Sequence, residues 1–324
     1  RYQEAAEILI ASLGLKREET QDSGMAPFLY LPHVLFVSKY GLEDFEVSMQ
    51  AQYELTQRFT AEFSIRPFLE RYPVTTLARL ETWAHDPNFH VRRLVSEGTR
   101  PRLPWAPRLR AFQKNPRPVL SLLELLKDDP ELYVRRSVAN NLNDIGKDHP
   151  ALLVETAHRW MVDATEERRW LVRHALRSAV KRAEPEALAV MGFGKDAIVA
   201  IDKISITPQQ AVIGEAVTIR FEISNTDSQY QHLLIDLRIY FVKATGKANP
   251  KVFKLKTIKL MPQETIQLSK VISLTNMTTR KHYAGIHQVE ILLNGQVVPF
   301  GAFELVPFRI MSNGLNDEQN GLCK

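Results

Sequence analysis

Hydrophobic residues recur at helical spacing through the first 195 residues of the chain and at alternate positions beyond residue 200. Within residues 1–14, the hydrophobic side chains form a stripe on one face of a predicted helix, which ends at Gly14. A loop is expected over 15–27, and Pro67 and Pro73 interrupt the pattern that follows. The spacing predicts three early helices, over 1–14, 28–40 and 43–65.

An internal repeat with a period near 40 residues comes next. The segment WAHDPNFHVRRLVSEG (83–98) matches LKDDPELYVRRSVANN (126–141) at an offset of 43 residues, and ERRWLVRHALRSAVKR (167–182) is a weaker third copy. Asp-Pro followed by Val-Arg-Arg at this period is typical of HEAT-type helical pairs. In such a pair we expect the Asp-Pro to begin the second helix, the valine to pack inward, and the arginines to lie along one face of a solenoid.

From Ile201 the pattern changes to the period of two that predicts strands. Seven candidate strands follow, separated by turn residues: 201–207, 216–224, 233–243, 251–260, 264–274, 285–294 and 297–305. Short strands at this density indicate an immunoglobulin-like sandwich. The predicted fold is therefore a HEAT-like α-solenoid over 1–195, an immunoglobulin-like β-sandwich over 196–308, and a flexible tail over 309–324.

Composition narrows the classes of protein further. The chain has 324 residues, of which 44% are hydrophobic and 24% charged, which fits two folded domains. It has no apolar run of about 18 residues, so no membrane-spanning helix is expected. A single cysteine, Cys323, excludes a disulfide framework and a cysteine-based zinc site, and it fits a cytoplasmic setting. No signal peptide is visible, and because the sequence begins at Arg1, we expect an N-terminal piece to be missing and the first repeat to be incomplete.

Positive charge is concentrated in one part of the chain. The net charge is +5, and the segment from Arg58 to Arg182 holds 23 Lys and Arg against 15 Asp and Glu. Clustered arginine on a helical scaffold is typical of proteins that bind a phosphate backbone, and a solvated surface with ion pairs is the alternative. The sequence contains none of the phosphate-loop, GxGxxG, HExxH or GxSxG motifs, and its histidines lack ligand spacing. We therefore expect neither metal nor nucleotide chemistry.

The segment VRRLVSEGTRPRLPWAP (91–107) is unusual. Glu97 is placed at the end of a helix, where the macrodipole disfavours a carboxylate. Trp105 follows in a stiff, proline-rich loop, with Arg100 and Arg102 nearby. Two readings are open: the tryptophan and the carboxylate form a contact site, or Trp105 fills the repeat core and Glu97 pairs with Arg93, one helical turn back.

The corresponding part of the next repeat, VRRSVANNLNDIGKDHP (134–150), carries three asparagines close to a helix end. Asparagine is a poor helix former, so these residues indicate either a cap or a polar pocket. Asp144 after them is either a catalytic carboxylate or a turn residue. Glu62, which lies among Phe59, Phe63 and Phe68, is either on an outer helix face or buried for a purpose.

Two of these motifs, SEGTRPRLPWAP (96–107) and VRRSVANNLNDIGKDHP (134–150), followed by a β-sandwich, resemble the AlkC branch of the HEAT-like-repeat DNA glycosylases. The resemblance covers nearly the whole chain. It implies a monofunctional enzyme, without metal or organic cofactor, that removes alkylated bases from double-stranded DNA, chiefly 3-methyladenine and 3-methylcytosine. The implied active-site residues are Glu62, Glu97, Trp105 and Asp144.

The chemistry of such a reaction suggests roles for these residues. Loss of a cationic base leaves an oxocarbenium-like sugar, which nearby carboxylates stabilise electrostatically. We expect Asp144 to activate water and stabilise the cation, and Glu97 and Glu62 to add negative field or position the substrate. Trp105 would pack its π face on the sugar or base.

The arginines and the sandwich complete the expected DNA interface. One member of each Arg-Arg pair is expected to face DNA and the other a neighbouring helix. The sandwich could clamp the duplex through Lys243, Lys247, Arg280 and Lys281, or it could serve stability or protein docking.

Two other functions compete with that of a glycosylase: a non-catalytic HEAT-repeat adaptor and a structural binder of bent DNA. We expect a cytoplasmic monomer, nucleoid-associated when on DNA, with eight phosphate-contacting residues: Arg92, Arg93, Arg100, Arg102, Arg135, Arg136, Arg173 and Arg177.

Overall fold

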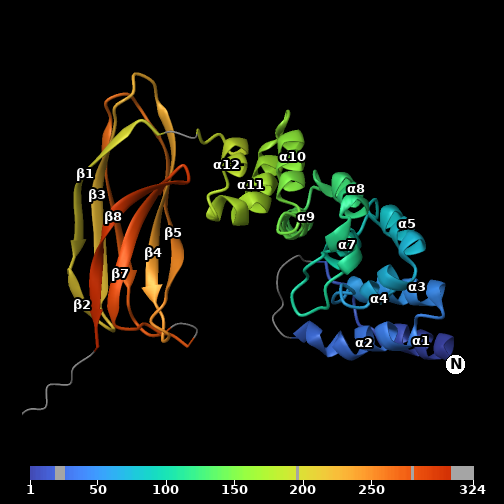
Figure 1. Ribbon diagram of the computed structural model, residues 1–324. Helices are drawn as coiled ribbons and strands as arrows, with labels where there is room; N and C mark the ends of the chain where they lie inside the picture. The colour runs from blue at the N-terminus through green and yellow to red at the C-terminus, as the bar shows by residue number, and fades with distance from the viewer. Residues whose placement is uncertain (19–25, 195–196, 279–280, 308–324) are drawn as a thin grey trace, which may run out of the picture. The chain divides into compact units, whose positions relative to one another are not determined.

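The computed structural model describes residues 1–18, 26–194, 197–278 and 281–307. The chain divides into two units, Arg1–Met191 and Gly192–Lys324. The first is helical and the second is built from strands, so the predicted fold class is confirmed (Figure 1). Arg280, Cys323 and the tail expected over 309–324 lie outside the described residues.

The described part of the first unit consists of α-helices and one 3₁₀ turn, η1 (Ala26–Tyr30). In this part of the chain, no helix is both long and apolar enough to cross a bilayer. The helices are α1 (Tyr2–Ala11), α2 (Leu31–Tyr40), α3 (Phe45–Thr56), α4 (Ile65–Arg71), α5 (Pro73–Trp83), α6 (Phe89–Gly98), α7 (Arg110–Lys114), α8 (Arg117–Leu126), α9 (Leu132–Ile145), α10 (Pro150–Met161), α11 (Glu166–Lys181) and α12 (Pro185–Val190).

The helices pair as the repeat predicts. Helix α5 packs against α6, α8 against α9, and α10 against α11, while α6 also packs against α9 and α9 against α11. Each Asp-Pro pair comes just before the second helix of its repeat, and Asn88 caps α6 by accepting a 2.8 Å hydrogen bond from the His90 amide. Val91 and Val134 are fully buried, which confirms that the valine of the motif packs inward.

The first arginine of each Val-Arg-Arg motif has a local structural role. Arg92 Nη1 donates to both carbonyls of its preceding Asp-Pro pair at 2.9 Å, and Arg135 does the same in the next repeat at 2.6 and 2.8 Å. Arg92 also forms an ion pair with Asp129, which belongs to the next repeat. These arginines therefore fix the turns and the spacing of the solenoid.

One predicted helix is interrupted. Helix α3 ends at Thr56 instead of continuing to residue 65, and turns precede α4. This break places Glu62 in a turn rather than on a helix face. Pro67 lies inside α4, in the first turn, where a backbone N–H has no intrahelical acceptor and a proline is tolerated.

The second unit is a β-sandwich of two sheets. One sheet has the order β1-β3-β6, and the other has the order β2-β8-β7-β4-β5. All neighbours are antiparallel except β2 and β8. The strands are β1 (Val199–Thr207), β2 (Gln210–Val212), β3 (Ala216–Asn225), β4 (Gln231–Val242), β5 (Ala248–Leu260), β6 (Thr265–Ser273), β7 (Gly285–Leu293) and β8 (Gln296–Val306).

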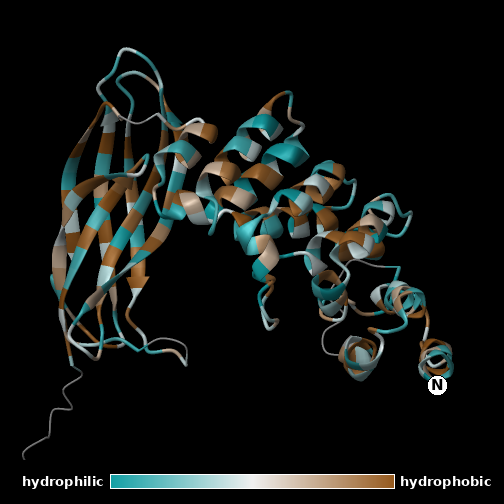
Figure 2. Ribbon diagram, turned by 45° about the vertical axis from the view of Figure 1, so that its right-hand side comes forward, coloured by the Kyte–Doolittle hydropathy of each residue, from teal (hydrophilic) through white to brown (hydrophobic). Residues whose placement is uncertain are grey.

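The seven predicted strands are all confirmed, and β2, only three residues long, is the one that the sequence did not reveal. Hydrophobic and hydrophilic residues alternate along the strands (Figure 2). The inward-facing set includes Phe221, Leu237, Ile291 and Phe303, which are buried between the sheets. The sandwich thus has its own hydrophobic core.

Candidate active site

Three of the four candidate residues lie near the ends of helices or in a turn of the solenoid. Glu97 is the penultimate residue of α6, and Asp144 is the penultimate residue of α9. Because α6 packs against α9, the two carboxylates approach one another although they are far apart in sequence. Glu62 enters from the turn before α4.

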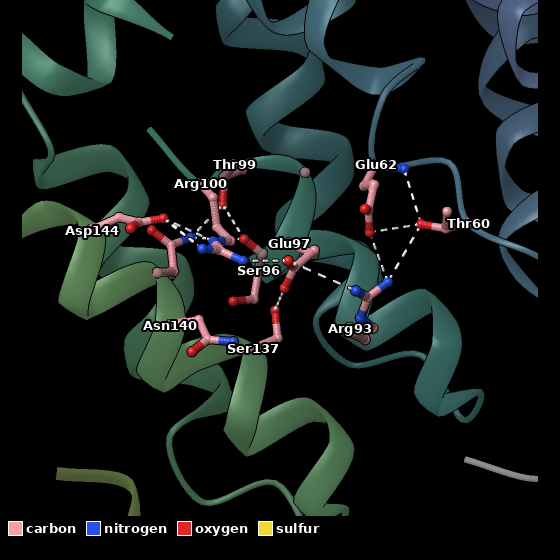
Figure 3. A network of polar contacts seen from close by, with 12 residues as sticks. Thr60, Glu62, Arg93, Ser96, Glu97, Thr99, Arg100, Ser137, Asn140 and Asp144 are labelled. Carbon is pink, nitrogen blue, oxygen red and sulfur yellow. Dashed lines mark hydrogen bonds and ion pairs between the residues drawn. The ribbon is translucent and has the colours of Figure 1, made fainter. Parts of the chain in front are cut away.

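Arg100 lies between the carboxylates of Glu97 and Asp144 (Figure 3). Its Nη1 is 2.6 Å from Glu97 Oε1, and its Nε and Nη2 are 2.9 and 2.8 Å from Asp144 Oδ2. All three side chains are buried. A guanidinium with five fixed donors is suited to bridging two carboxylates in this way.

Arg93 makes the next link. Its Nη1 is 2.9 Å from Glu62 Oε2, and its Nη2 is 3.7 Å from Glu97 Oε1. Thr60 Oγ1 donates to the same Glu62 oxygen at 2.9 Å. Carboxylates and guanidiniums therefore alternate across the solenoid, from Glu62 through Arg93, Glu97 and Arg100 to Asp144 (Figure 3).

Glu97 remains ionised despite its burial. Ser137 on α9 donates a 2.6 Å hydrogen bond to Glu97 Oε2. Burial by itself would raise the pKa of the Glu97 carboxyl, but the charges of Arg93 and Arg100 and the Ser137 hydrogen bond outweigh it and hold that pKa below its ordinary value. The two guanidiniums also offset the unfavourable position of this carboxylate at a helix C-terminus.

Asp144 has a second cationic partner that the sequence reasoning passed over. Lys147, in the turn after α9, places Nζ 2.8 Å from Asp144 Oδ1. The signal was present in the sequence, because residues three apart lie on the same side of a helical turn. Each oxygen of this carboxylate is thus held by a different cation.

The three asparagines of the second motif tie α9 to its neighbours. Asn141 Nδ2 donates to the carbonyl of Ser96 at 2.7 Å, and Asn143 Nδ2 donates to the carbonyl of Ala175 at 2.6 Å. Asn140 Oδ1 accepts hydrogen bonds from α11. The three asparagines satisfy buried polar groups where three helices meet, which positions the end of α9 that carries Asp144.

Trp105 does not fill the repeat core. Its side chain is 90% exposed, and its φ of 62° is a left-handed conformation that a bulky residue rarely adopts. Buried Arg66 holds the loop around it by donating to the carbonyls of Gly98 and Arg100 at 3.1 and 2.8 Å and to that of Pro107. The loop is therefore fixed at both ends while it presents the indole to solvent.

A hollow lies beside this loop. It has a volume of about 410 Å³ and is mostly apolar. Residues of η1, α2, α4 and the loop line it, including Phe28, Leu31, Leu35, Phe63, Pro67 and Trp105. Trp105 is thus part of a hydrophobic surface next to the turn that carries Glu62.

The arginines expected to meet DNA fall into two groups. Arg92, Arg93, Arg100, Arg102 and Arg135 are engaged within the protein, where carboxylates or backbone carbonyls occupy their donors. The two Arg-Arg pairs were each expected to divide between DNA and a neighbouring helix. In the first pair, both Arg92 and Arg93 are engaged within the protein. In the second pair, only Arg135 is engaged. Arg136, Arg173 and Arg177 are exposed, although Arg173 Nη2 lies 3.6 Å from Glu166 Oε2 and Arg177 donates to Asn140.

No cluster of three or more His, Cys, Asp or Glu side chains suited to a metal ion occurs in the part of the chain that the structure describes.

Comparisons with known proteins place the site in a family. Residues 58–182 match the family model described as DNA alkylation repair enzyme, and residues 200–307 match that of the C-terminal Ig-like domain of the uncharacterised protein YhaZ. The curated protein YhaZ of Bacillus subtilis is 40% identical over 262 residues, covering 81% of this chain and 72% of its own length. The structure of Pseudomonas fluorescens AlkC, an alkylpurine DNA glycosylase bound to DNA containing an abasic site analogue, is 40% identical with a TM-score of 0.83, covering 94% of this chain and 87% of that one. The chain belongs to the AlkC-type DNA alkylation repair enzymes.

All four candidate residues of this AlkC-type chain lie within the region that matches the repair-enzyme model. The AlkC-type solenoid joins Glu62, Glu97 and Asp144 through shared arginines. Trp105 stands apart from that polar network, at the exposed end of the loop that begins beside Glu97.

Proposed function

We propose that this chain is a monofunctional DNA glycosylase that releases 3-methyladenine and 3-methylcytosine from double-stranded DNA. The observation that carries the proposal is the alternating row of three carboxylates, two of them buried and one half-buried, and two guanidiniums inside the repair-enzyme region. An adaptor has no need of carboxylates buried together in a segment that is otherwise rich in positive charge. The similarity to AlkC supports DNA as the partner.

The substrate chemistry matches this arrangement. An N3-alkylated adenine or cytosine is a cation and leaves as a neutral base, so it needs little general-acid assistance. As the bond from the base to C1′ breaks, its electron pair goes to the base and positive charge develops on the deoxyribose. Preorganised carboxylates stabilise that charge without reorganising during the reaction.

Each carboxylate has a distinct place in this proposal. Asp144 is the residue that activates water, because its Oδ1 is held only from the side of an exposed lysine. Glu97 and Glu62 lie further along the row and contribute negative field. Water adds to C1′ of the sugar cation while its proton passes to the Asp144 carboxylate.

Trp105 is the contact residue for DNA. Its indole is exposed on a loop whose ends are fixed, so it can pack on a sugar or base without a large loss of conformational freedom. The π face of an indole also attracts positive charge. The exposed residues Arg136, Arg173 and Arg177 are the phosphate contacts that we assign on the solenoid, and Lys243, Lys247 and Lys281 are candidates on the sandwich.

The proposal is tested by base release. The protein is incubated without added metal with duplex DNA that carries one 3-methylcytosine, and separately with methylated genomic DNA, and the free base is measured by mass spectrometry. We expect release by the wild type and its loss in Asp144→Asn and Glu97→Gln. Glu155→Gln, which removes an exposed carboxylate on α10, is the matched control and should retain activity.

Two results would contradict the proposal. The absence of release from either substrate by a folded wild-type protein that still binds DNA would favour the non-catalytic adaptor. Equal loss of DNA binding and base release in Asp144→Asn would remove the catalytic role of that residue.

A further inference from the structure

Two cations hold the carboxylate of Asp144, and they differ in how firmly they are fixed. Arg100 contacts Oδ2, has a side chain only 10% exposed, and is also bound to Glu97. Lys147 contacts Oδ1 at 2.8 Å from a side chain that is 39% exposed. Its ammonium group is carried by a flexible chain of four carbons, and the residue lies in a turn rather than in a helix. Lys147 is therefore the partner that can leave without breaking a second buried contact.

This difference distinguishes the two oxygens of the carboxylate. Moving Arg100 away from Oδ2 would also break its ion pair with Glu97, whereas moving Lys147 from Oδ1 returns an ammonium group to solvent. The oxygen that can turn toward a substrate is therefore Oδ1. In the free protein a positive charge already occupies the position next to it.

We propose that Lys147 is a placeholder cation that yields Asp144 Oδ1 to the positively charged sugar of the substrate. The inference rests on the proposed function, because it takes Asp144 as the carboxylate that faces the reacting sugar. It makes Lys147 a residue that determines specificity. A positively charged sugar has to displace Lys147 from Oδ1, whereas an uncharged nucleotide leaves the Lys147–Asp144 pair in place, so the lysine lowers the preference of the site for the cation.

The surroundings of Asp144 allow the exchange. Besides Arg100, three further arginines interact electrostatically with this carboxylate: Arg66, Arg102 and Arg177. The aspartate therefore keeps positive neighbours when Lys147 moves away. For the same reason, we expect a Lys147→Met protein to fold.

The experiment compares two abasic analogues in otherwise identical DNA duplexes. One carries a pyrrolidine, whose protonated ring nitrogen represents the sugar cation, and the other carries the uncharged tetrahydrofuran. The measured quantity is the ratio of the two dissociation constants, which cancels contacts made equally to both duplexes. We expect Lys147→Met to raise the preference for pyrrolidine by up to about fivefold, the strength of an exposed ion pair.

Two control variants accompany this measurement. Lys181→Met removes the same charge at an exposed position of α11 and should leave the ratio unchanged. Lys147→Arg keeps a cation at the site and should keep the wild-type ratio. Single-turnover release of 3-methylcytosine should also be faster in Lys147→Met.

An unchanged or smaller preference for pyrrolidine in Lys147→Met would overturn the inference. An equal loss of affinity for both duplexes, together with a weaker salt dependence, would show instead that Lys147 binds a phosphate. Failure of the proposed function is a separate result, because the wild-type protein would then release no base.

Discussion

Arg92 and Asp129 form a bidentate ion pair that joins two successive repeats of the solenoid. Arg92 Nε lies 2.6 Å from Asp129 Oδ2, and Nη2 lies 3.0 Å from Oδ1. The aspartate belongs to the Asp-Pro pair of one repeat and the arginine to the Val-Arg-Arg of the repeat before it. The Val-Arg-Arg of one repeat and the Asp-Pro of the next thus meet in space at this boundary and join the two repeats.

We expect Arg92→Gln to lower the free energy of unfolding by about 3 kcal/mol, because it leaves the buried Asp129 carboxylate without its charged partner. Arg168→Gln is the comparison, because its partner Asp128 is 45% exposed and the loss should stay below about 1 kcal/mol. Urea denaturation measures both values. Equal effects of the two substitutions would show that the Arg92 pair does not hold the repeats together.

Two substitutions of Trp105 distinguish the contribution of the indole to base release from the contribution of the backbone conformation to stability. Trp105→Ala and Trp105→Gly both remove the ring and should lower single-turnover base release by about tenfold or more. Glycine accepts the φ of 62°, so the glycine variant should be more stable than the alanine variant by about 1 kcal/mol. Urea denaturation and base release are measured on the same samples. Retained release in both variants would exclude a contact role for the indole.

The pH dependence of base release should respond to Arg93. Its charge contributes to holding the pKa of the Glu97 carboxyl low, so the wild-type enzyme should keep Glu97 ionised as the pH falls through the ordinary range of a glutamate. In Arg93→Gln the effect of burial is less opposed, and the acid limb of the rate profile should move to higher pH. Single-turnover rates between about pH 4.5 and 8 test this, with Arg79→Gln, whose partner Glu46 is on the surface, as control. An unmoved acid limb in Arg93→Gln would contradict the assignment.

Acid should destabilise the fold through His90. Burial, assisted by the charges of Arg17 and Arg93, lowers the pKa of this histidine to about 4, so the unfolded state binds more protons between that value and about 6.5. The contribution of neutral His90 to the free energy of unfolding is therefore fully present above pH 6.5 and is lost as the pH falls toward 4. The loss should be about 2 kcal/mol between pH 7 and pH 5. Urea denaturation of the wild type and of His90→Phe at the two pH values gives the difference. A slope as steep in the variant as in the wild type would assign the effect to other groups.

The salt dependence of DNA binding should identify the phosphate contacts. Arg136→Gln and Arg173→Gln each remove an exposed charge from the repeat region, and each should reduce the slope of log affinity against log salt by about 1. Arg159→Gln removes a charge from α10, which is not one of the helices that carry the assigned contacts, and it should change the slope less. A slope unaffected by the first two substitutions would exclude these arginines as contacts.

The fold was predictable because its signals are local and repeated. Period-two alternation marks each long strand, and the Asp-Pro and Val-Arg-Arg elements mark the repeats. The failures lie where tertiary contacts decide. The chain turns after Thr56 although the apolar spacing continues, and β2 is too short to show any period and exists because it pairs with β8.

The candidate site was less predictable, because the same residue type serves different purposes at neighbouring positions. Arg92, Arg93 and Arg136 look alike in sequence, yet the first fixes a turn, the second lies between carboxylates, and the third is exposed. Which partner an arginine meets depends on how adjacent repeats pack. Sequence spacing indicated Glu97 and Asp144 as unusual, but only the packing of α6 on α9 shows that they share Arg100.

In the proposed glycosylase, Arg66 has a consequence for the kinetics of DNA binding. By holding the carbonyls of Gly98, Arg100 and Pro107, it immobilises the whole segment that carries Trp105 before any nucleic acid is present. The entropy lost on ordering that segment is therefore lost once, when the chain folds, and not again at each encounter with DNA. A protein that inspects many undamaged base pairs for every lesion can then release each of them quickly, since no disordered loop has to close and reopen at every step.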